Sequence, residues 1–118
     1  MFAPCPAAPN CVSSDARDPR HAIAPFVLES AAEDSWPRIR AGILALPRTT
    51  LVVADTTYLH AECRSLLGFT DDLEIQLRPD ENLLAVRSAS RIGYYDFGVN
   101  RRRIETLRRL LQKHGLIQ

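Results

Sequence analysis

The apolar positions of the chain recur with two different periods, and these periods predict the elements of its fold. Apolar side chains return at helical spacing over residues 36–46, which predicts a first helix that ends at Pro47. The same spacing returns over residues 104–111 and predicts a last helix, with Asn100 as its N-cap and Gly115 as its stop.

The segment between these helices alternates with a period of two, which is typical of strands. In residues 57–64, for example, polar side chains take one face and apolar side chains take the other. The turns between such runs are too short for crossover helices, so we expect consecutive strands to pair antiparallel as a four-stranded meander. The predicted strands are residues 50–54, 57–64, 73–78 and 82–88.

The first 25 residues differ in composition from the rest of the chain. They contain five prolines and almost no apolar periodicity, and proline both fixes φ and removes a backbone donor. We therefore expect an irregular, proline-rich N-terminal arm over residues 1–25 and a core over residues 26–118. A chain of 118 residues is long enough for a single domain with its own core. The expected fold class is α+β, with a four-stranded antiparallel meander sheet and two helices packed on one face.

Charged residues are distributed unevenly along the chain. From Arg87 onwards there are eight basic and two acidic residues, whereas the preceding segment has seven basic and twelve acidic residues. Such asymmetry indicates either a dipolar surface or pairing between the two halves. In the last helix, Arg103 falls within the apolar arc of the helical wheel and Arg102 points away from it. An arginine directed at the sheet needs a partner or a ligand.

Residues 87–104 contain more hydrogen-bonding and charged groups than any other segment of similar length. They run from a predicted strand through a loop with two glycines into the last helix, and a helix N-terminus offers unpaired N–H groups to anions. Arginine side chains match carboxylate or phosphate groups. We therefore expect a non-catalytic module that binds a small anionic ligand at the start of this helix. The candidate ligand-binding residues are Ser88, Ser90, Arg91, Asn100, Arg101 and Arg103.

The same arginines also fit a structural role. In that interpretation, ion pairs hold the last helix on the sheet, and binding of another protein at this surface is a third interpretation. The sequence leaves the three interpretations open. The candidates for the ion pairs are Asp71, Asp72, Asp96 and Arg87.

Tyr94, Tyr95 and Phe97 lie between arginines, an arrangement that also occurs on surfaces that stack nucleic-acid bases. The loop lacks the glycine–aromatic pattern of RNA-binding motifs, and a sequence pI near 7.8 is not typical of a dedicated nucleic-acid binder. We therefore expect these rings to pack at the end of the sheet, and we do not expect nucleic acid as a partner.

Two of the three cysteines lie close together in the arm. Five residues, two of them prolines, separate Cys5 from Cys11, and the pair can form a disulfide, pack as thiols or act as a redox couple. Paired zinc ligands are spaced more closely than this, and His60 and Cys63 fall on opposite faces of a strand. We therefore expect no metal site and no cofactor. Cys63 has the position of a small core residue.

An enzyme is the alternative to a binding module. Thiol chemistry would use Cys5 and Cys11, and carboxylate chemistry would use Asp71 and Asp72. Adjacent residues of a strand face opposite sides, however, so the two carboxylates are not expected to share one site.

Four motifs follow one another along the chain: residues 5–14 (Cys-Pro-Ala-Ala-Pro-Asn-Cys-Val-Ser-Ser), residues 58–65 (Tyr-Leu-His-Ala-Glu-Cys-Arg-Ser), Asp71-Asp72, and residues 87–104, which begin Arg-Ser-Ala-Ser-Arg. Together they resemble the family catalogued as domain of unknown function 1499 over nearly the whole chain. The family has no established reaction, so the resemblance implies motif residues but no activity. These residues are Cys5, Cys11, Tyr58, Asp71, Asp72, Arg87, Ser88, Ser90, Arg91, Asp96, Asn100, Arg101 and Arg103.

The expected location depends on which of two observations is used. No apolar run approaches the length of a membrane-spanning helix, and the N-terminus lacks the basic and apolar regions of a secretory signal. The sequence as written therefore predicts a cytoplasmic protein. Relatives in the resembled family carry a membrane or lipoprotein segment ahead of the Cys-Pro motif, which implies the bacterial envelope as the alternative.

Overall fold

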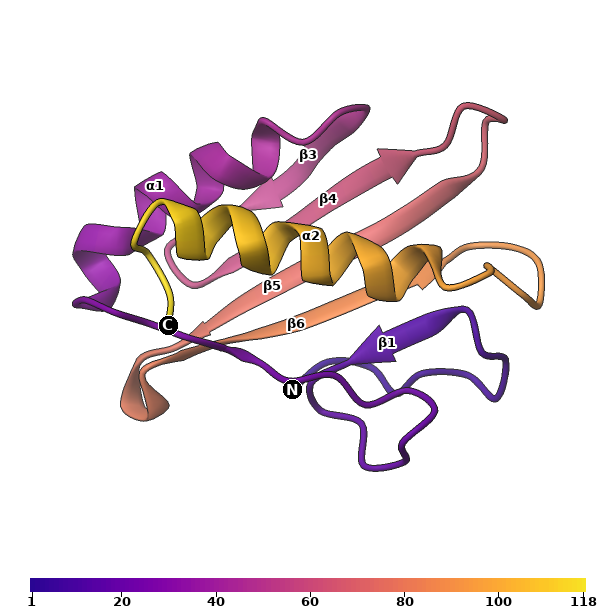
Figure 1. The fold of residues 1–118 in the computed structure, drawn as a ribbon, viewed down its shortest axis with the longest axis horizontal. Coiled ribbons are helices and arrows are strands. Elements are labelled where there is room, and N and C mark those ends of the chain that lie inside the picture. Colours follow the sequence, from indigo (N-terminus) through magenta and orange to yellow (C-terminus); the bar gives the residue numbers. More distant parts are fainter.

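The alternating and helical segments form one antiparallel sheet with two helices on one of its faces (Figure 1). The structure, a computed structural model, describes all 118 residues. In chain order the elements are β1 (Cys11–Ser13), β2 (Phe26–Val27), α1 (Ala32–Leu44), β3 (Thr49–Ala54), β4 (Tyr58–Arg64), β5 (Thr70–Arg78), the 3₁₀ turn η1 (Pro79–Glu81), β6 (Leu83–Ser90) and α2 (Val99–Lys113).

Strands β3, β4 and β5 each pair antiparallel with the next strand in the chain. The sheet order is β1-β6-β5-β4-β3, and β2 pairs with β6 outside this order. The register aligns Leu59 with Ile75, and Ile75 with Val86. Because side chains alternate along a strand, this register collects the apolar side chains on the face that the helices cover. The polar side chains of the same strands lie on the opposite face, which we call the open face.

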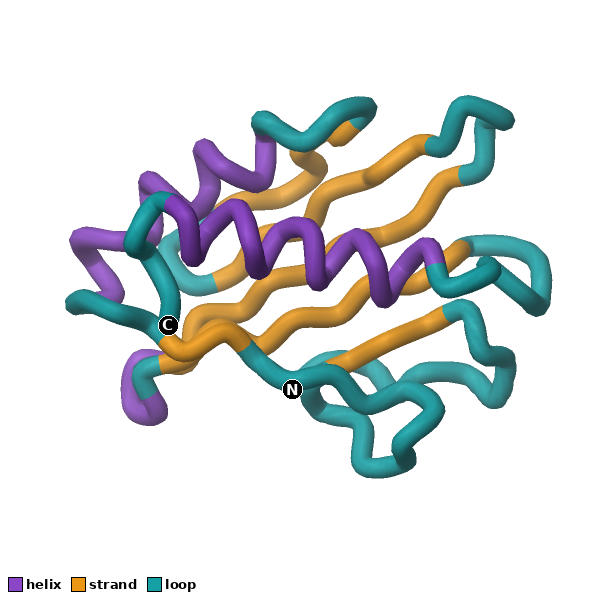
Figure 2. Tube along the Cα trace, viewed as in Figure 1, coloured by secondary structure: helices purple, strands orange, loops and turns teal.

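The sheet has six strands, so the predicted number of four is wrong, whereas the α+β class with two helices and an antiparallel sheet is confirmed. The two additional strands come from the N-terminal segment and both pair with β6: Cys11 aligns with Ala89, and Phe26 aligns with Leu84. Most of the remaining N-terminal segment is loop (teal in Figure 2). Strands of three and two residues are too short to show an alternating pattern.

The hydrophobic core lies between the helices and the covered face of the sheet. Ile39 and Ile43 of α1 and Ile104, Leu107 and Leu111 of α2 are fully buried there. Full burial of such a side chain contributes about 1.5–3 kcal/mol, so these residues hold both helices on the sheet. Neither helix combines the length and apolar character needed to cross a membrane.

One end of the molecule brings together the segments that carry the candidate site. Figure 1 shows the start of α2, the loop that precedes it and the β4–β5 loop at this end. The last strand, β6, ends here as well, so the strand, loop and helix of residues 87–104 form one continuous structure beside the β4–β5 turn.

Candidate functional site

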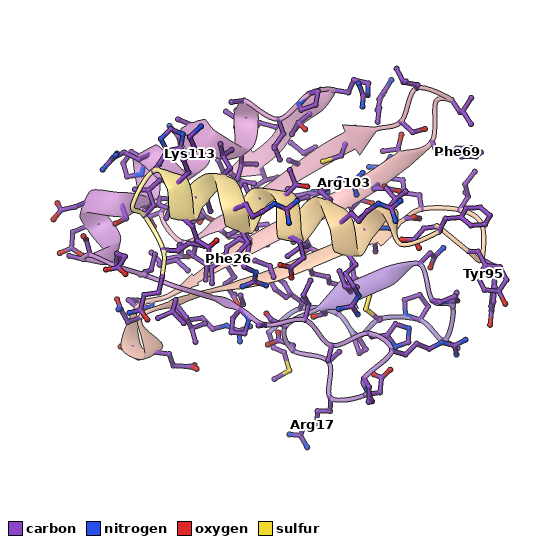
Figure 3. All side chains as sticks on the ribbon, viewed as in Figure 1. Arg17, Phe26, Phe69, Tyr95, Arg103 and Lys113 are labelled. Atoms are coloured by element: carbon purple, nitrogen blue, oxygen red, sulfur yellow. A yellow bond between two sulfur atoms is a disulfide. The ribbon has the colours of Figure 1, made fainter.

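The side chain of Arg103, labelled at α2 in Figure 3, reaches from this helix to Asp71 of β5 in the sheet. One terminal nitrogen is 2.8 Å from a carboxylate oxygen of Asp71, and both side chains of this ion pair are largely buried. The other terminal nitrogen donates to Ser88 Oγ at 3.1 Å and to Asn100 Oδ1 at 2.9 Å. The guanidinium therefore has a counter-charge and hydrogen-bond acceptors, which offset the cost of burying it.

Asn100 extends this cluster to β6 and to the N-terminal arm. It accepts the hydroxyl of Ser88 at 2.6 Å, and its Nδ2 donates to Ser90 Oγ at 2.9 Å and to the carbonyl of Asn10 at 3.2 Å. Asn100 is fully buried, and no buried side-chain nitrogen or oxygen in the protein lacks a partner. We call the cluster the buried polar network. Its members are Asp71, Ser88, Ser90, Asn100 and Arg103.

Asp96 caps helix α2 from the preceding loop. Its carboxylate accepts the backbone N–H of Gly98 at 2.9 Å and that of Asn100 at 3.0 Å. Burial favours a raised pKa for Asp96, but the donors from Asn100 and Gly98 outweigh it and hold this pKa below its ordinary value. The helix begins at Val99, and its N-cap is Gly98 in a left-handed conformation with φ of 78°. The prediction that Asn100 is the N-cap is therefore wrong, and Asn100 instead faces the sheet.

Arg101 does not reach the buried polar network. Its guanidinium donates to the backbone carbonyls of Ala22 at 3.0 Å and Arg20 at 3.4 Å. These two carbonyls belong to the N-terminal arm, so Arg101 fastens the arm to the first turn of α2.

Arg91 lies on the open face of the sheet and is also separate from the network. It donates to Asp72 at 2.9 Å and pairs with Glu62, while His60 Nε2 lies 2.7 Å from the same Asp72 carboxylate. The hydrogen bond from Arg91 is the main reason that the pKa of Asp72 lies below its ordinary value; His60 adds to the effect, and burial opposes it. As the strand alternation predicts, Asp71 and Asp72 face opposite sides of the sheet.

Arg87 and Glu74 form a second group on the open face. Arg87 pairs with Glu74 at 3.4 Å and donates to the backbone carbonyls of Ala3 and Pro4. The hydroxyl of Tyr58 donates to Glu74 at 2.6 Å, and burial together with this carboxylate raises the pKa of Tyr58. These contacts hold the start of the chain against β6.

The three cysteines have two different states. Cys5 and Cys11 form a disulfide within the arm, so the disulfide interpretation is confirmed. Cys63 is a free thiol that is buried on the covered face of the sheet, and burial raises its pKa. No three side chains of the His, Cys, Asp and Glu types are grouped so that they could hold a metal ion.

A second group of arginines lies beside the buried polar network, where the start of α2 approaches the first residues of β3. Arg48, Arg64, Arg102 and Arg103 line a pocket of about 260 Å³ that has no acidic residue in its wall. Arg48 and Arg102 donate only to backbone carbonyls, those of Arg64 and Phe97. No carboxylate lies within ion-pair distance of Arg48, Arg64 or Arg102. We call this the arginine pocket.

Sequence reasoning did not identify Arg48 and Arg64 as site residues. Arg48 directly precedes β3 and Arg64 is the last residue of β4, and the alignment of Thr49 with Cys63 places the two arginines side by side. The N–H of Arg64 donates to the carbonyl of Arg48 at 2.9 Å. The predicted hairpin could have indicated that the two arginines are neighbours, because the start of its first strand lies beside the end of its second strand. Arg102 was expected to point away from the apolar arc of α2, and in the structure it lines the arginine pocket.

The comparisons with known proteins identify the family of the chain. A family model described as "Protein of unknown function (DUF1499)" matches residues 1–111 of the 118 residues. No curated protein and no solved structure gives a significant match. The match includes the disulfide, the open-face groups, the buried polar network and the start of α2. The chain therefore belongs to the DUF1499 family.

Proposed function

We propose that this protein is a non-catalytic module that binds a small anionic ligand in the arginine pocket at the start of α2. The observation that carries this proposal is that three arginines, Arg48, Arg64 and Arg102, line one pocket and have no carboxylate partner. Like charges around one pocket repel one another, so a bound anion would relieve the repulsion. Planar guanidinium groups also match the geometry of phosphate and carboxylate oxygens.

The buried polar network supports the proposal because it fixes the fourth arginine. Arg103 forms one wall of the pocket, and its position is set by Asp71, Ser88 and Asn100. A side chain that is held in place before binding loses little conformational entropy when a ligand arrives. The network therefore supplies a rigid support, and the three arginines without carboxylate partners supply the net positive charge.

The size of the pocket indicates the class of ligand. A volume of about 260 Å³ is just below the ~300–1,000 Å³ range of ligand pockets, so it suits a phosphate or carboxylate group with a small substituent. Arg101 and Arg91, which the sequence also nominated, contact the arm and the open face and are not part of this proposal.

Inorganic phosphate is the direct probe of the proposal. Phosphate should raise the melting temperature of the protein more than sodium chloride does at equal ionic strength, since a ligand that binds only the folded state stabilises it. Arg64→Ala and Arg102→Ala should each reduce this shift. Arg38→Ala is the matched control, because Arg38 is an exposed arginine of α1 and does not line the pocket. Equal shifts with phosphate and chloride would contradict the proposal.

Arg48→Gly separates binding from stability more sharply. Arg48 has φ of 53°, a left-handed conformation that is unfavourable for most residues and readily adopted by glycine. The substitution should therefore leave the free energy of unfolding unchanged or raise it, while it weakens phosphate binding. If phosphate binding weakens while stability is undiminished, the weaker binding cannot be attributed to a loss of folded structure. Unchanged phosphate binding would show that Arg48 is not part of the site.

No observation favours the enzyme alternative. Cys5 and Cys11 are joined in a disulfide, and Asp71 and Asp72 lie on opposite faces of the sheet, each with an arginine partner. Neither pair presents a nucleophile with an adjacent base or two carboxylates at one site.

A further inference from the structure

Two loops at the end of the molecule expose large apolar side chains. They are the β4–β5 loop and the loop between β6 and α2, and Figure 3 shows Phe69 and Tyr95, one from each loop, at this end. The prediction that the rings of the second loop pack at the end of the sheet is therefore wrong. We call this group the apolar tip. Its members, with exposed fractions from 52% to 88%, are Leu66, Leu67, Phe69, Ile92, Tyr95 and Phe97.

The fold gains little from these side chains. Phe97 is 88% exposed and has φ of 54°, a left-handed conformation that is strained for a bulky residue. Leu66 and Leu67 are each 85% exposed. Single exposed apolar residues are common, but a contiguous group of this kind usually marks a surface that another molecule covers.

Positive charge borders the apolar tip on the side of the arginine pocket, whereas on the open face Arg91 is paired with Asp72 and Glu62. Arg64 directly precedes the first loop, and Arg102 donates from α2 to the carbonyl of Phe97 in the second loop at 2.6 Å. The only acidic residue in the two loops is Asp96, whose carboxylate accepts the N–H groups at the start of α2. Neighbouring Asp71 is neutralised by Arg103. The tip thus presents apolar side chains beside unpaired guanidinium groups.

We propose that the apolar tip docks on an anionic phospholipid surface. Leucine, isoleucine and aromatic side chains that project from loops are suited to the boundary between headgroups and acyl chains, where apolar burial and attraction to anionic lipid act together. In this arrangement the arginine pocket takes lipid phosphate, so the inference rests on the proposed function for the identity of the anion.

Vesicle sedimentation tests the proposal. The protein should bind vesicles of equal parts phosphatidylcholine and phosphatidylglycerol more strongly than vesicles of phosphatidylcholine alone. Phe97→Asn and Leu67→Ser should each weaken binding to the mixed vesicles about tenfold, because each removes an apolar side chain that docking would bury in the bilayer. Arg64→Ala should weaken it about fivefold, as expected for one basic residue near an anionic surface.

The variants are chosen so that failure to fold does not imitate failure to bind. Asparagine tolerates the left-handed conformation at Phe97, and Leu67 is too exposed to support the core. Val27→Ser is the matched control, since Val27 is an exposed apolar residue of β2, which pairs with the opposite end of β6. This variant should bind vesicles as the parent protein does.

Three results would overturn the proposal. The first is no binding to the mixed vesicles, and the second is equal binding to both vesicle types. The third is a protein that does not bind vesicles but self-associates, with the self-association abolished by Leu67→Ser. If the protein does not bind vesicles but phosphate still raises its melting temperature through Arg64 and Arg102, the lipid inference is wrong and the proposed phosphate site stands. If the protein does not bind mixed vesicles and phosphate does not raise its melting temperature, both the lipid inference and the proposed function are wrong.

Discussion

Replacing Asp71 with asparagine tests the buried polar network and the arginine pocket in one variant. The change removes the only carboxylate that pairs with Arg103 while it preserves the shape of the side chain. Asp71 is 6% exposed, so the substitution leaves a guanidinium largely buried without a counter-charge. Breaking one partner of a buried ion pair costs about 3–5 kcal/mol.

The lower end of that range applies to this site. Arg103 keeps its hydrogen bonds to Ser88 and Asn100 in the variant, and its side chain is 15% exposed. We therefore expect Asp71→Asn to lower the free energy of unfolding by about 3 kcal/mol, or the melting temperature by about 10 °C. Phosphate affinity should change in the opposite direction: it should rise several-fold, because the pocket gains a positive charge that no carboxylate offsets.

Urea unfolding and phosphate titration measure the two effects. A double-mutant cycle with Arg103→Met should give a coupling of about 2 kcal/mol, because the double variant leaves no unpaired buried charge. Glu105→Gln is the control: it breaks a more exposed ion pair with Arg108 and should cost only about 0.5 kcal/mol. A loss below about 1 kcal/mol for Asp71→Asn with additive double-variant energies would refute the role of the network, and weaker phosphate binding would refute the charge argument.

Three further predictions concern the arm, the cap of α2 and the glycine before it. Cys5→Ser should lower the free energy of unfolding by about 2 kcal/mol, the entropic contribution of a short disulfide loop, and comparing oxidised and reduced parent protein should show the same difference. Asp96→Asn should cost about 1 kcal/mol at neutral pH in urea unfolding. Because the folded pKa of Asp96 is lowered, its contribution is present above the ordinary aspartate pKa and is lost as the pH falls through the folded value, so the parent and variant should converge in acid. Gly98→Ala should destabilise the protein by about 1 kcal/mol and weaken phosphate binding, since the new Cβ would lie 2.9 Å from Arg102 Nη1; at Gly115 the same change meets no atom and should affect stability alone.

Periodicity predicted the elements of the fold where the elements are long. Strands β4 and β5 have seven and nine residues and alternate along their length, so the pattern shows both their position and their faces. Strands β1 and β2 were not among the four predicted strands, because three and two residues cannot show alternation. They become strands through hydrogen bonds to β6, which are tertiary contacts.

The same distinction holds for the candidate site. The helical wheel directed Arg103 at the sheet and strand alternation separated Asp71 from Asp72, since each depends on the geometry of one element. The convergence of Arg48 with Arg64 depends on the register of a hairpin, and the convergence of both with α2 depends on how that helix packs. The pattern of a single element shows neither the register of a hairpin nor the packing position of a helix.

The pairing of β1 and β2 with β6 has a consequence for how the chain acquires its structure during translation. Strands β1 and β2 leave the ribosome before β6 and remain without this partner until residues 83–90 have emerged. The ring closed by Cys5 and Cys11 spans only a few residues and needs no other part of the sheet, so it is able to form on the nascent chain. Contacts that are distant in sequence form slowly. A disulfide ring that closes beforehand would constrain the backbone up to Cys11, the first residue of β1, before this strand pairs with β6.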